Sequence, residues 1–284
     1  MIKLIAFIDG SNYSKSVCDH SAWIAGRIEA SVDLIHILGR RDESSTPVDL
    51  SGSIGLGART ALLEELAELD GKMARLKHKR GRAILDDARE IVLNAGVKQV
   101  NTLLRNDEIV ETVQTFDADA GLIVIGKRGK KTGVDEAHLG SNFERVVRAS
   151  HKPVLVASRT FKPIKRILIA FDGGASSLKA INYLAGSPAF NDLDCHLLSV
   201  AEPTDRATQQ LEGAAAALRN AGYKVESTLQ AGQPEKVICE TIKRANIDLL
   251  LMGAYGHSRI RTLIIGSTTT AMIRTCKIPV LLFR

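Results

Sequence analysis

Short apolar runs alternate with longer stretches of helical periodicity along the whole chain. In its second half, five apolar runs bounded by turn-forming residues are typical of buried strands. They lie near residues 166–171, 195–200, 224–229, 248–252 and 279–283. Strands that alternate with helices favour a parallel sheet with helices on both faces. The pattern predicts an α/β fold of two tandem doubly wound domains, each with a mainly parallel five-stranded sheet.

The prediction of two domains depends on an internal repeat. LIAFIDG at residues 4–10 is echoed by ILIAFDG at 167–173, so that Asp9 matches Asp172. Later in each unit, a Gly-x-x-Gly pair recurs and is followed by K-P-V in the first unit and by I-P-V in the second. We therefore expect domains at residues 1–160 and 161–284, joined near 162–165, with the first domain longer by an extra segment near 41–80.

The extra segment holds a glycine-rich stretch and a predicted helix. Residues 51–57 contain glycines that follow no strand, which favours a linker. Apolar residues then recur in steps of 4, 3, 4 and 3, which is the spacing of one helix face. They are Leu62, Leu66, Leu69, Met73 and Leu76. A core face or a subunit-packing face is the expected role of this stripe.

A glycine pattern near the end of the chain carries the clearest functional signal. Gly253 and Gly256 follow an apolar strand, and Gly266 and Ser267 stand where the next helix begins, with Thr268 after them. Glycines let a backbone approach a phosphate closely, and free N–H groups at a helix start attract anions. The pattern predicts a phosphate-binding loop, although turn formation and close packing alone would also use these glycines.

Composition places the chain among globular proteins with 45% hydrophobic and 25% charged residues. The first residues enter a strand without the features of a signal peptide, so we expect a cytoplasmic protein. No C-x-x-C pair is formed by the four cysteines, which are Cys18, Cys195, Cys239 and Cys276. We therefore expect reduced thiols and no metal site. Residues 161–284 carry 15 Lys and Arg against 10 Asp and Glu, whereas residues 1–160 carry 23 against 22. A basic second half suits an anionic ligand and equally suits a solvated surface.

With these motifs in view, the chain resembles a tandem universal stress protein, with two UspA-type domains covering nearly its whole length. Residues 253–283 are similar to the ATP-binding signature G-x2-G-x9-G-[ST] of that family and to its closing helix and strand. The resemblance implies that the aspartate after strand one and the hydrophobic residue after strand two contact adenine or ribose. These are Asp172 and Val200, with Asp9 and Ile37 as first-domain counterparts.

The first domain departs from the signature. Gly126 and Gly129 are followed by ten residues, rather than nine, before Gly140 and Ser141. The spacer also carries Asp135 and Glu136, whose charges would oppose a phosphate if they pointed inward. We therefore predict a weaker nucleotide site in the first domain and a dependable one in the second.

Three functions remain open at this level. The first is an ATP-binding stress-response protein that acts as a nucleotide-dependent regulator or sensor, with ATP bound alone or with Mg²⁺. The second is an ATP-hydrolysing or ATP pyrophosphatase-like enzyme, although no convincing catalytic set is present in the sequence. The third is an interaction module with vestigial sites. We expect no membrane or specific nucleic-acid partner, and we expect a homodimer built from intrachain pseudo-dimers.

Overall fold

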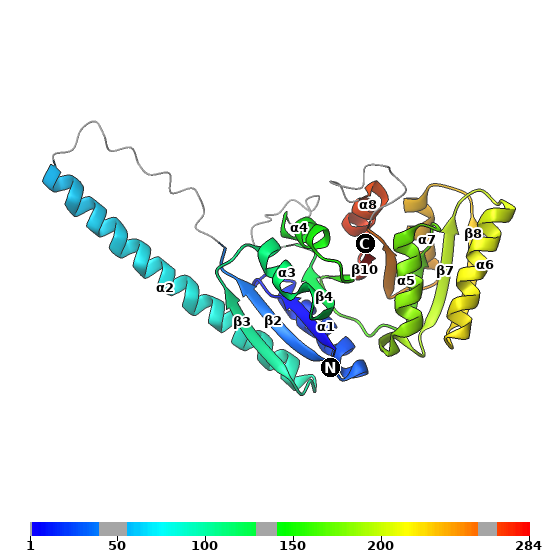
Figure 1. Ribbon diagram of the computed structural model, residues 1–284, viewed down its shortest axis with the longest axis horizontal. Coiled ribbons are helices and arrows are strands. Elements are labelled where there is room, and N and C mark those ends of the chain that lie inside the picture. Colours follow the sequence, from blue (N-terminus) through cyan, green and yellow to red (C-terminus); the bar gives the residue numbers. More distant parts are fainter. Residues whose placement is uncertain (1, 40–55, 129–140, 255–265) are drawn as a thin grey trace.

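The computed structural model describes residues 2–39, 56–128, 141–254 and 266–284, with side chains described from residue 62 in the second range and from 142 in the third. Two α/β halves lie side by side, and one long helix projects from the first half (Figure 1). Gly129, Gly140 and Gly256 of the predicted glycine loops lie outside the described residues, as does the linker predicted at 51–55. Residues 56 and 57 of that predicted linker instead begin a helix.

Within the described residues, the strands fall where apolar runs occur. They are β1 (Lys3–Phe7), β2 (Ser31–Ile37), β3 (Val100–Arg105), β4 (Ala120–Gly126), β5 (Val154–Ala157), β6 (Arg166–Ala170), β7 (Asp194–Val200), β8 (Lys224–Gln230), β9 (Leu249–Gly253) and β10 (Val280–Phe283). The five strands predicted for the second half are confirmed as β6 to β10, with each end within one residue of the prediction.

The described helices connect these strands in the order that the sequence predicts. They are α1 (Ser14–Ile28), α2 (Leu56–Asn94), α3 (Ile109–Asp117), α4 (Ser141–Ala149), α5 (Ala175–Gly186), α6 (Asp205–Asn220), α7 (Pro234–Arg244) and α8 (Ser267–Thr275), with a short 3-10 turn at Pro188–Phe190. Each half thus repeats strands and crossover helices, as the doubly wound α/β prediction requires.

The strands form one continuous sheet in the order β3-β2-β1-β4-β5-β10-β9-β6-β7-β8. Neighbours within each half are parallel, and the halves meet where β10 pairs with β5 in antiparallel register. Leu281 is opposite Leu155 at the centre of this pairing. The two five-stranded sheets predicted from the sequence are therefore joined edge to edge, and neither closing strand is left as an open edge.

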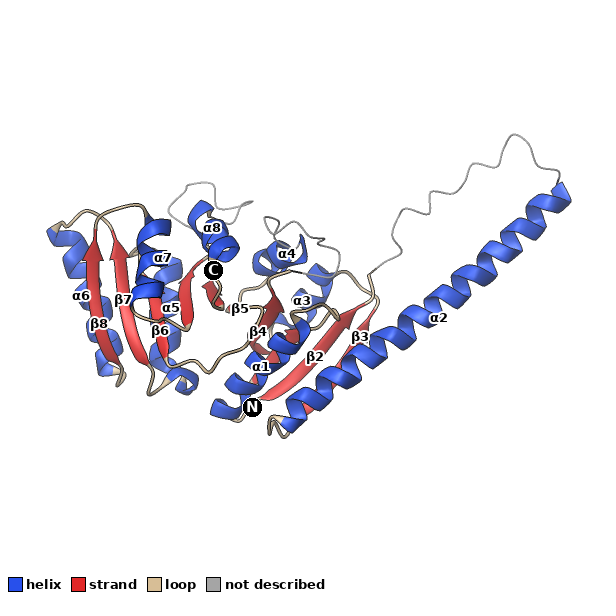
Figure 2. Ribbon diagram, turned by 180° about the vertical axis from the view of Figure 1, so that it is seen from behind, coloured by secondary structure: helices blue, strands red, loops and turns tan. Residues whose placement is uncertain are grey.

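Helices lie on both sides of the sheet (Figure 2), and an apolar core on each face runs through both halves. Alternate residues of a strand enter different cores, as Leu4 and Ile5 of β1 do. Helices α1, α2, α5 and α6 cover one face, while α3, α4, α7 and α8 cover the other. The second face positions the candidate site, because α4 and α8 follow the glycine loops.

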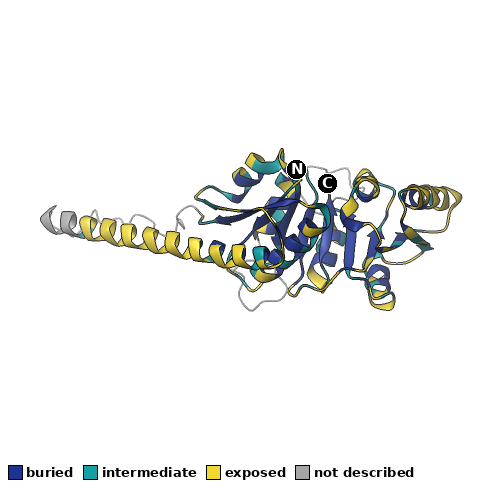
Figure 3. Cartoon of the chain, turned by 90° about the horizontal axis from the view of Figure 1, so that it is seen from below, coloured by how far each residue is buried: buried dark blue, intermediate teal, exposed yellow. Residues whose placement is uncertain are grey.

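Helix α2 has 39 residues and is the largest departure from the repeat, since its counterpart α6 has 16. Its final turns pack on the sheet through Leu85, Ala88 and Val92. Residues 63–80 are exposed along the part that projects beyond the sheet (Figure 3). The predicted apolar stripe is therefore not part of the core of this chain.

Candidate functional site

The predicted second-half residues gather at one edge of the sheet. Ala170 at the end of β6 is in register with Met252 of β9 and Leu198 of β7, and the next backbone N–H, that of Phe171, donates to Leu198 O at 2.8 Å. Asp172, Val200 and Ala254 each come two residues after these registered positions. This is the carboxyl edge of neighbouring parallel strands, where α/β sheets bind their ligands.

Val200 also lies on the face of the sheet that α8 covers. Its side chain is partly buried against the core that contains Met272 and Ile273 of α8. Ile37 has the same place in the first half, partly buried against that same core. Each hydrophobic residue at the end of a second strand is therefore on the side of its glycine-loop helix.

Asp172 organises the turn that leads from β6 into α5. Its Oδ1 accepts hydrogen bonds from Gly174 N at 2.9 Å and from Ser177 Oγ at 2.7 Å. Gly173 has a φ of 71°, in the left-handed region that glycine enters without strain. Asp172 is exposed to solvent while it holds this turn. Its carboxylate therefore has a structural role at the same edge where the predicted ligand contact would occur.

The first half builds the same turn after β1. Asp9 Oδ1 accepts from Ser11 N at 2.9 Å and from Ser14 Oγ at 3.3 Å, and Gly10 has a φ of 72°. Ser14 stands at the position that matches Ser177 in the repeat. An aspartate, a left-handed glycine and a serine thus recur with one geometry in both halves.

The two ends of the second glycine loop meet at the sheet edge. Gly266 N donates to Ala254 O at 3.1 Å, and Thr269 Oγ1 donates to Gly253 O at 2.9 Å. Ala254 N in turn donates to Phe283 O at 2.7 Å, which ties the loop to β10. Residues 255–265 between these ends are outside the described residues. The start of α8 is therefore fixed next to the end of β9.

The N-terminus of α8 has the features of an anion site. Gly266 is its N-cap residue and supplies no side-chain hydrogen bond to the first turn, which contains no acidic residue. Ser267 is exposed there. Thr268 Oγ1, which the sequence assigns to the phosphate loop, donates to Glu235 Oε1 of α7 at 2.9 Å. Backbone N–H groups and the helix dipole remain as the attraction for an anion.

The corresponding helix of the first half is different in charge. Ser141 begins α4, and the first turn of α4 carries Glu144, whose carboxylate lies 3.5 Å from Arg148. Thr270 holds the matching position in α8. An acidic side chain in the first turn satisfies the helix dipole with the protein's own charge and would repel a phosphate.

Lys127, directly after Gly126, contacts the second half. Its Nζ donates to Arg274 O and to Cys276 O, both at 3.0 Å, at the C-terminal end of α8. Burial lowers the pKa of Lys127. A cation at this helix end complements the dipole of α8. Lys127 thus stabilises the helix of the second loop and is not directed at a phosphate of the first.

The profile of the universal stress protein family matches residues 1–158 and 163–284. The chain belongs to the universal stress protein family. A universal stress protein of Synechocystis sp. is 36% identical over 287 residues and covers all of both chains. A universal stress protein of Methanocaldococcus jannaschii is 33% identical over 165 residues, covering 56% of this chain and 84% of the relative.

The solved structures agree with this assignment at the level of the fold. A universal stress protein from Archaeoglobus fulgidus superposes with a TM-score of 0.71 at 19% identity, covering 99% of this chain and 96% of that one. The resemblance to a tandem universal stress protein is therefore confirmed, and so is the doubly wound α/β fold. The boundary at residue 160 and the individual site residues stay predictions.

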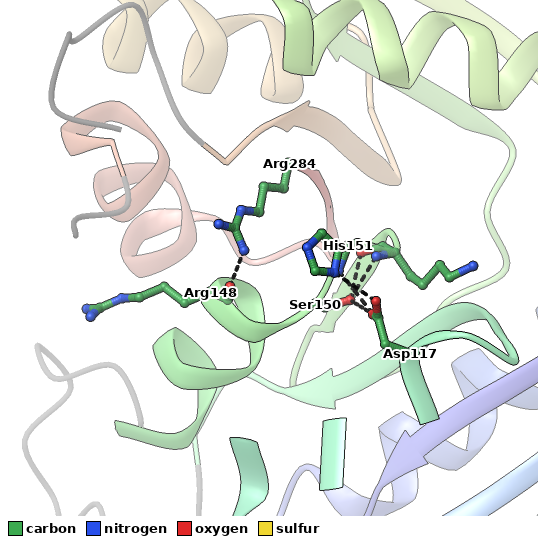
Figure 4. Close-up of polar contacts among 6 residues, drawn as sticks. Asp117, Arg148, Ser150, His151 and Arg284 are labelled. Atoms are coloured by element: carbon green, nitrogen blue, oxygen red, sulfur yellow. Dashed lines mark hydrogen bonds and ion pairs between the residues drawn. The ribbon is translucent and has the colours of Figure 1, made fainter. Parts of the chain in front are cut away.

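Sequence reasoning missed a polar cluster between α3 and β5 in this universal stress protein (Figure 4). Asp117 accepts from Ser150 Oγ at 3.0 Å and is bonded to His151 Nδ1 at 2.9 Å. Partial burial would raise the pKa of Asp117, but the hydrogen bonds from His151 and Ser150 outweigh it and hold the pKa below its usual range. Serine and histidine both bond to the aspartate, rather than serine to histidine, so the cluster fixes a turn and lacks the geometry of a nucleophilic triad.

Residues from separate elements complete the surroundings of these sites. Arg284 donates to Arg148 O at the end of α4, so each glycine-loop helix receives a cation from the opposite half at its C-terminus (Figure 4).

The described residues contain no cluster of three metal-binding side chains. Among them, no helix combines the length and apolar character that a bilayer crossing requires.

Proposed function

We propose that this universal stress protein binds ATP, mainly in its second half, and acts as a nucleotide-dependent regulator or sensor in a stress response. The observation that carries the proposal is the N-terminus of α8, which has no side-chain cap and no acid in its first turn. It is held beside the end of β9 by the bond from Gly266 N to Ala254 O. Such a helix start accommodates phosphate groups, and ATP carries three of them.

The base would lie along the same sheet edge. Val200 offers an apolar surface on the face that α8 covers, and Asp172 stands at the same level after the neighbouring strand. Because the Asp172 carboxylate is already fixed in this turn, its contact with a ligand would cost little further side-chain conformational entropy. Asp9, Ile37 and Gly126 could form a weaker counterpart in the first half, where Glu144 opposes phosphate.

Nucleotide released from purified, denatured protein tests the proposal. We expect adenine nucleotide in the wild-type protein and its loss in Gly253→Ala and Gly266→Val, because added side chains would keep phosphate from the backbone. Gly213→Ala is a matched control, since a Cβ at Gly213 in α6 meets nothing within 4 Å. No released nucleotide, together with no heat of ATP binding in calorimetry, would overturn the proposal.

A regulator binds ATP without obligatory turnover, in contrast to the ATP-hydrolysing or pyrophosphatase-like alternative. Phosphate and pyrophosphate release should therefore stay near the rate of the Gly266→Val variant, with or without Mg²⁺. Release that is faster in the wild-type protein and lost in that variant would favour the enzyme.

We further infer a cytoplasmic protein that forms a homodimer. All four cysteines are free, and three of them are buried, which suits a reducing compartment. The closing strands β5 and β10 already pair within one chain, so a second chain must use another surface. Multi-angle light scattering at micromolar concentration checks the homodimer independently of nucleotide content.

A further inference from the structure

Helix α2 changes its surroundings abruptly near Gly81. A Cβ at Gly81 would lie 2.7 Å from Leu104 Cδ1 and 3.0 Å from His36 Cδ2, so the helix touches β2 and β3 closely at this point. Every residue from 63 to 80 is exposed (Figure 3). In proteins, most of the stability of a helix comes from the packing of its apolar face on other elements.

The projecting part of α2 carries an apolar stripe that this chain does not cover. Leu62 is half-buried, but Leu66, Leu69, Met73 and Leu76 are 44%, 50%, 55% and 60% exposed. Steps of 4 and 3 are the spacing of the a and d positions of a coiled coil, with Leu66 and Met73 at a and Leu69 and Leu76 at d. The stripe therefore has the form of a seam for another helix.

Charge along the same segment is divided at Gly71. Residues 62–71 contain four acidic residues and no lysine or arginine, whereas residues 72–80 contain five basic residues and no acid. The acidic residues are Glu64, Glu65, Glu68 and Asp70, and the basic ones are Lys72, Arg75, Lys77, Lys79 and Arg80. Two copies of the segment are therefore complementary in charge when they run antiparallel, because the acidic half of each then faces the basic half of the other.

We propose that α2 pairs with α2 of a second copy of this chain in an antiparallel two-helix coil centred at Gly71. This inference names the surface of the homodimer proposed above. Centring at Gly71 places Leu66 opposite the partner's Leu76, and Leu69 opposite the partner's Met73. The acidic half of each helix then lies along the basic half of the other. A parallel pair would instead align acid with acid and base with base.

The projection leaves room for this arrangement. Residues 62–80 span roughly 28 Å at the rise of an α-helix, and Gly71 is their midpoint. In an antiparallel pair the point where each helix meets its own sheet, near Gly81, lies beside the free end of the other helix. The two α/β bodies therefore stand at opposite ends of the coil, and their sheet edges at β5 and β10 remain paired within each chain.

Sedimentation of the full chain tests the surface. We expect a dimer for the wild-type protein and a monomer at the same micromolar concentration for Leu66→Ser with Leu69→Ser, with an apparent dissociation constant raised at least tenfold. Leu178→Ser is the matched control, because Leu178 of α5 is 45% exposed, as Leu66 is 44% exposed. A monomeric wild-type protein, or a double variant that dimerises like the wild type, overturns the proposal.

Nucleotide content separates this proposal from the proposed function. The double serine variant should retain the nucleotide of the wild-type protein, since α2 covers the face opposite α8. The Gly266→Val variant should in turn remain a dimer. Either inference can therefore fail while the other stands.

Disulfide formation tests the orientation. In a Cys239→Ser background, which removes the one partly exposed native cysteine, chains with Leu69→Cys and chains with Met73→Cys are oxidised separately and as a mixture. We expect the crosslinked dimer mainly in the mixture, because residue 69 faces the partner's residue 73 in the antiparallel pair. Efficient crosslinking of each variant alone would indicate a parallel pair and would contradict the proposal.

Discussion

The turn after the first strand is nearly identical in the two halves, whereas the helix that follows the glycine loop is not. Asp9 and Asp172 each hold a serine hydroxyl and a backbone N–H beside a left-handed glycine. By contrast, α4 has Glu144 in its first turn and α8 has no acid there. The shared aspartate turn is explained by folding alone, so it does not distinguish a binding half from a non-binding one.

The halves differ in whether the glycine-loop helix carries an acid in its own first turn, and in what covers the neighbouring turn. The Glu235 carboxylate beside the start of α8 belongs to α7 and accepts a hydrogen bond from Thr268. Ile84 of α2 lies over Gly10, while Gln210 of α6 lies over Gly173. An apolar side chain beside the turn and an acid at the helix start both make the first half less suited to a polyphosphate. The second half keeps a polar side chain and an uncapped helix start. Substitutions that exchange these features should exchange the binding properties.

Exchange of the first-turn residues should have the largest effect. Thr270→Glu should weaken ATP binding at least tenfold, or about 1.4 kcal/mol, because it places a carboxylate near the proposed phosphate site. Isothermal titration calorimetry measures the change. An acid in the first turn favours the helix, so loss of binding would not reflect unfolding.

The reverse substitution, Glu144→Thr, is the control for that exchange. It removes the acid from α4 and should leave binding in the second half unchanged. Equal ATP affinity in Thr270→Glu and in the wild-type protein would show that first-turn charge does not separate the halves.

Removal of the two turn aspartates should cost stability equally but affect binding unequally. Asp9→Ala and Asp172→Ala each lose the hydrogen bonds that order the turn, which should lower the free energy of unfolding by about 1–2 kcal/mol. Urea denaturation measures this loss. Only Asp172→Ala should also weaken ATP binding, and a matching loss in Asp9→Ala would argue for two equivalent sites.

A buried histidine in the first half should make the free energy of unfolding depend on pH. His20 is fully buried, its Nδ1 is bonded to Ser16 O at 2.7 Å, and its Nε2 has no hydrogen-bond partner in the described structure. Burial lowers the pKa of His20 below the usual 6.5, so the unfolded chain binds a proton that the folded chain does not. The free energy of unfolding should therefore decrease as the pH falls below 6.5, by up to about 1.4 kcal/mol per pH unit.

The matching residue of the second half, Tyr183, does not titrate in this range, because burial raises its pKa to about 12. His20→Leu should therefore flatten the pH dependence of the urea midpoint below pH 6.5. An unchanged slope in that variant would assign the acid sensitivity to other groups.

The smallest expected difference concerns the left-handed glycines. Alanine at either Gly10 or Gly173 must adopt a strained φ. Alanine at Gly10 would lie 2.7 Å from Ile84 Cδ1, whereas alanine at Gly173 would lie 3.1 Å from Gln210 Oε1. Gly10→Ala should therefore be the more destabilising, by about 1 kcal/mol. Thermal denaturation of the two variants compares them, and equal losses would mean that Ile84 moves aside without cost.

The sequence predicts what depends on local patterns. Apolar runs located the strands of the second half, and the repeat identified the matching turns at Asp9 and Asp172. The leucine stripe of α2 revealed an apolar face but not whether this chain covers it, because spacing alone does not identify a partner. The contact of Lys127 with α8 and the bond of Thr268 to Glu235 join residues far apart in sequence, so they depend on how the elements pack.

The amount of nucleotide bound per chain tests the central claim most directly. Denatured wild-type protein should release one adenine nucleotide per chain. Thr270→Glu should release much less, and Glu144→Thr should release no less than the wild type. Two nucleotides per wild-type chain, or the same amount from Thr270→Glu as from the wild-type protein, would contradict the account of a single dependable site in the second half.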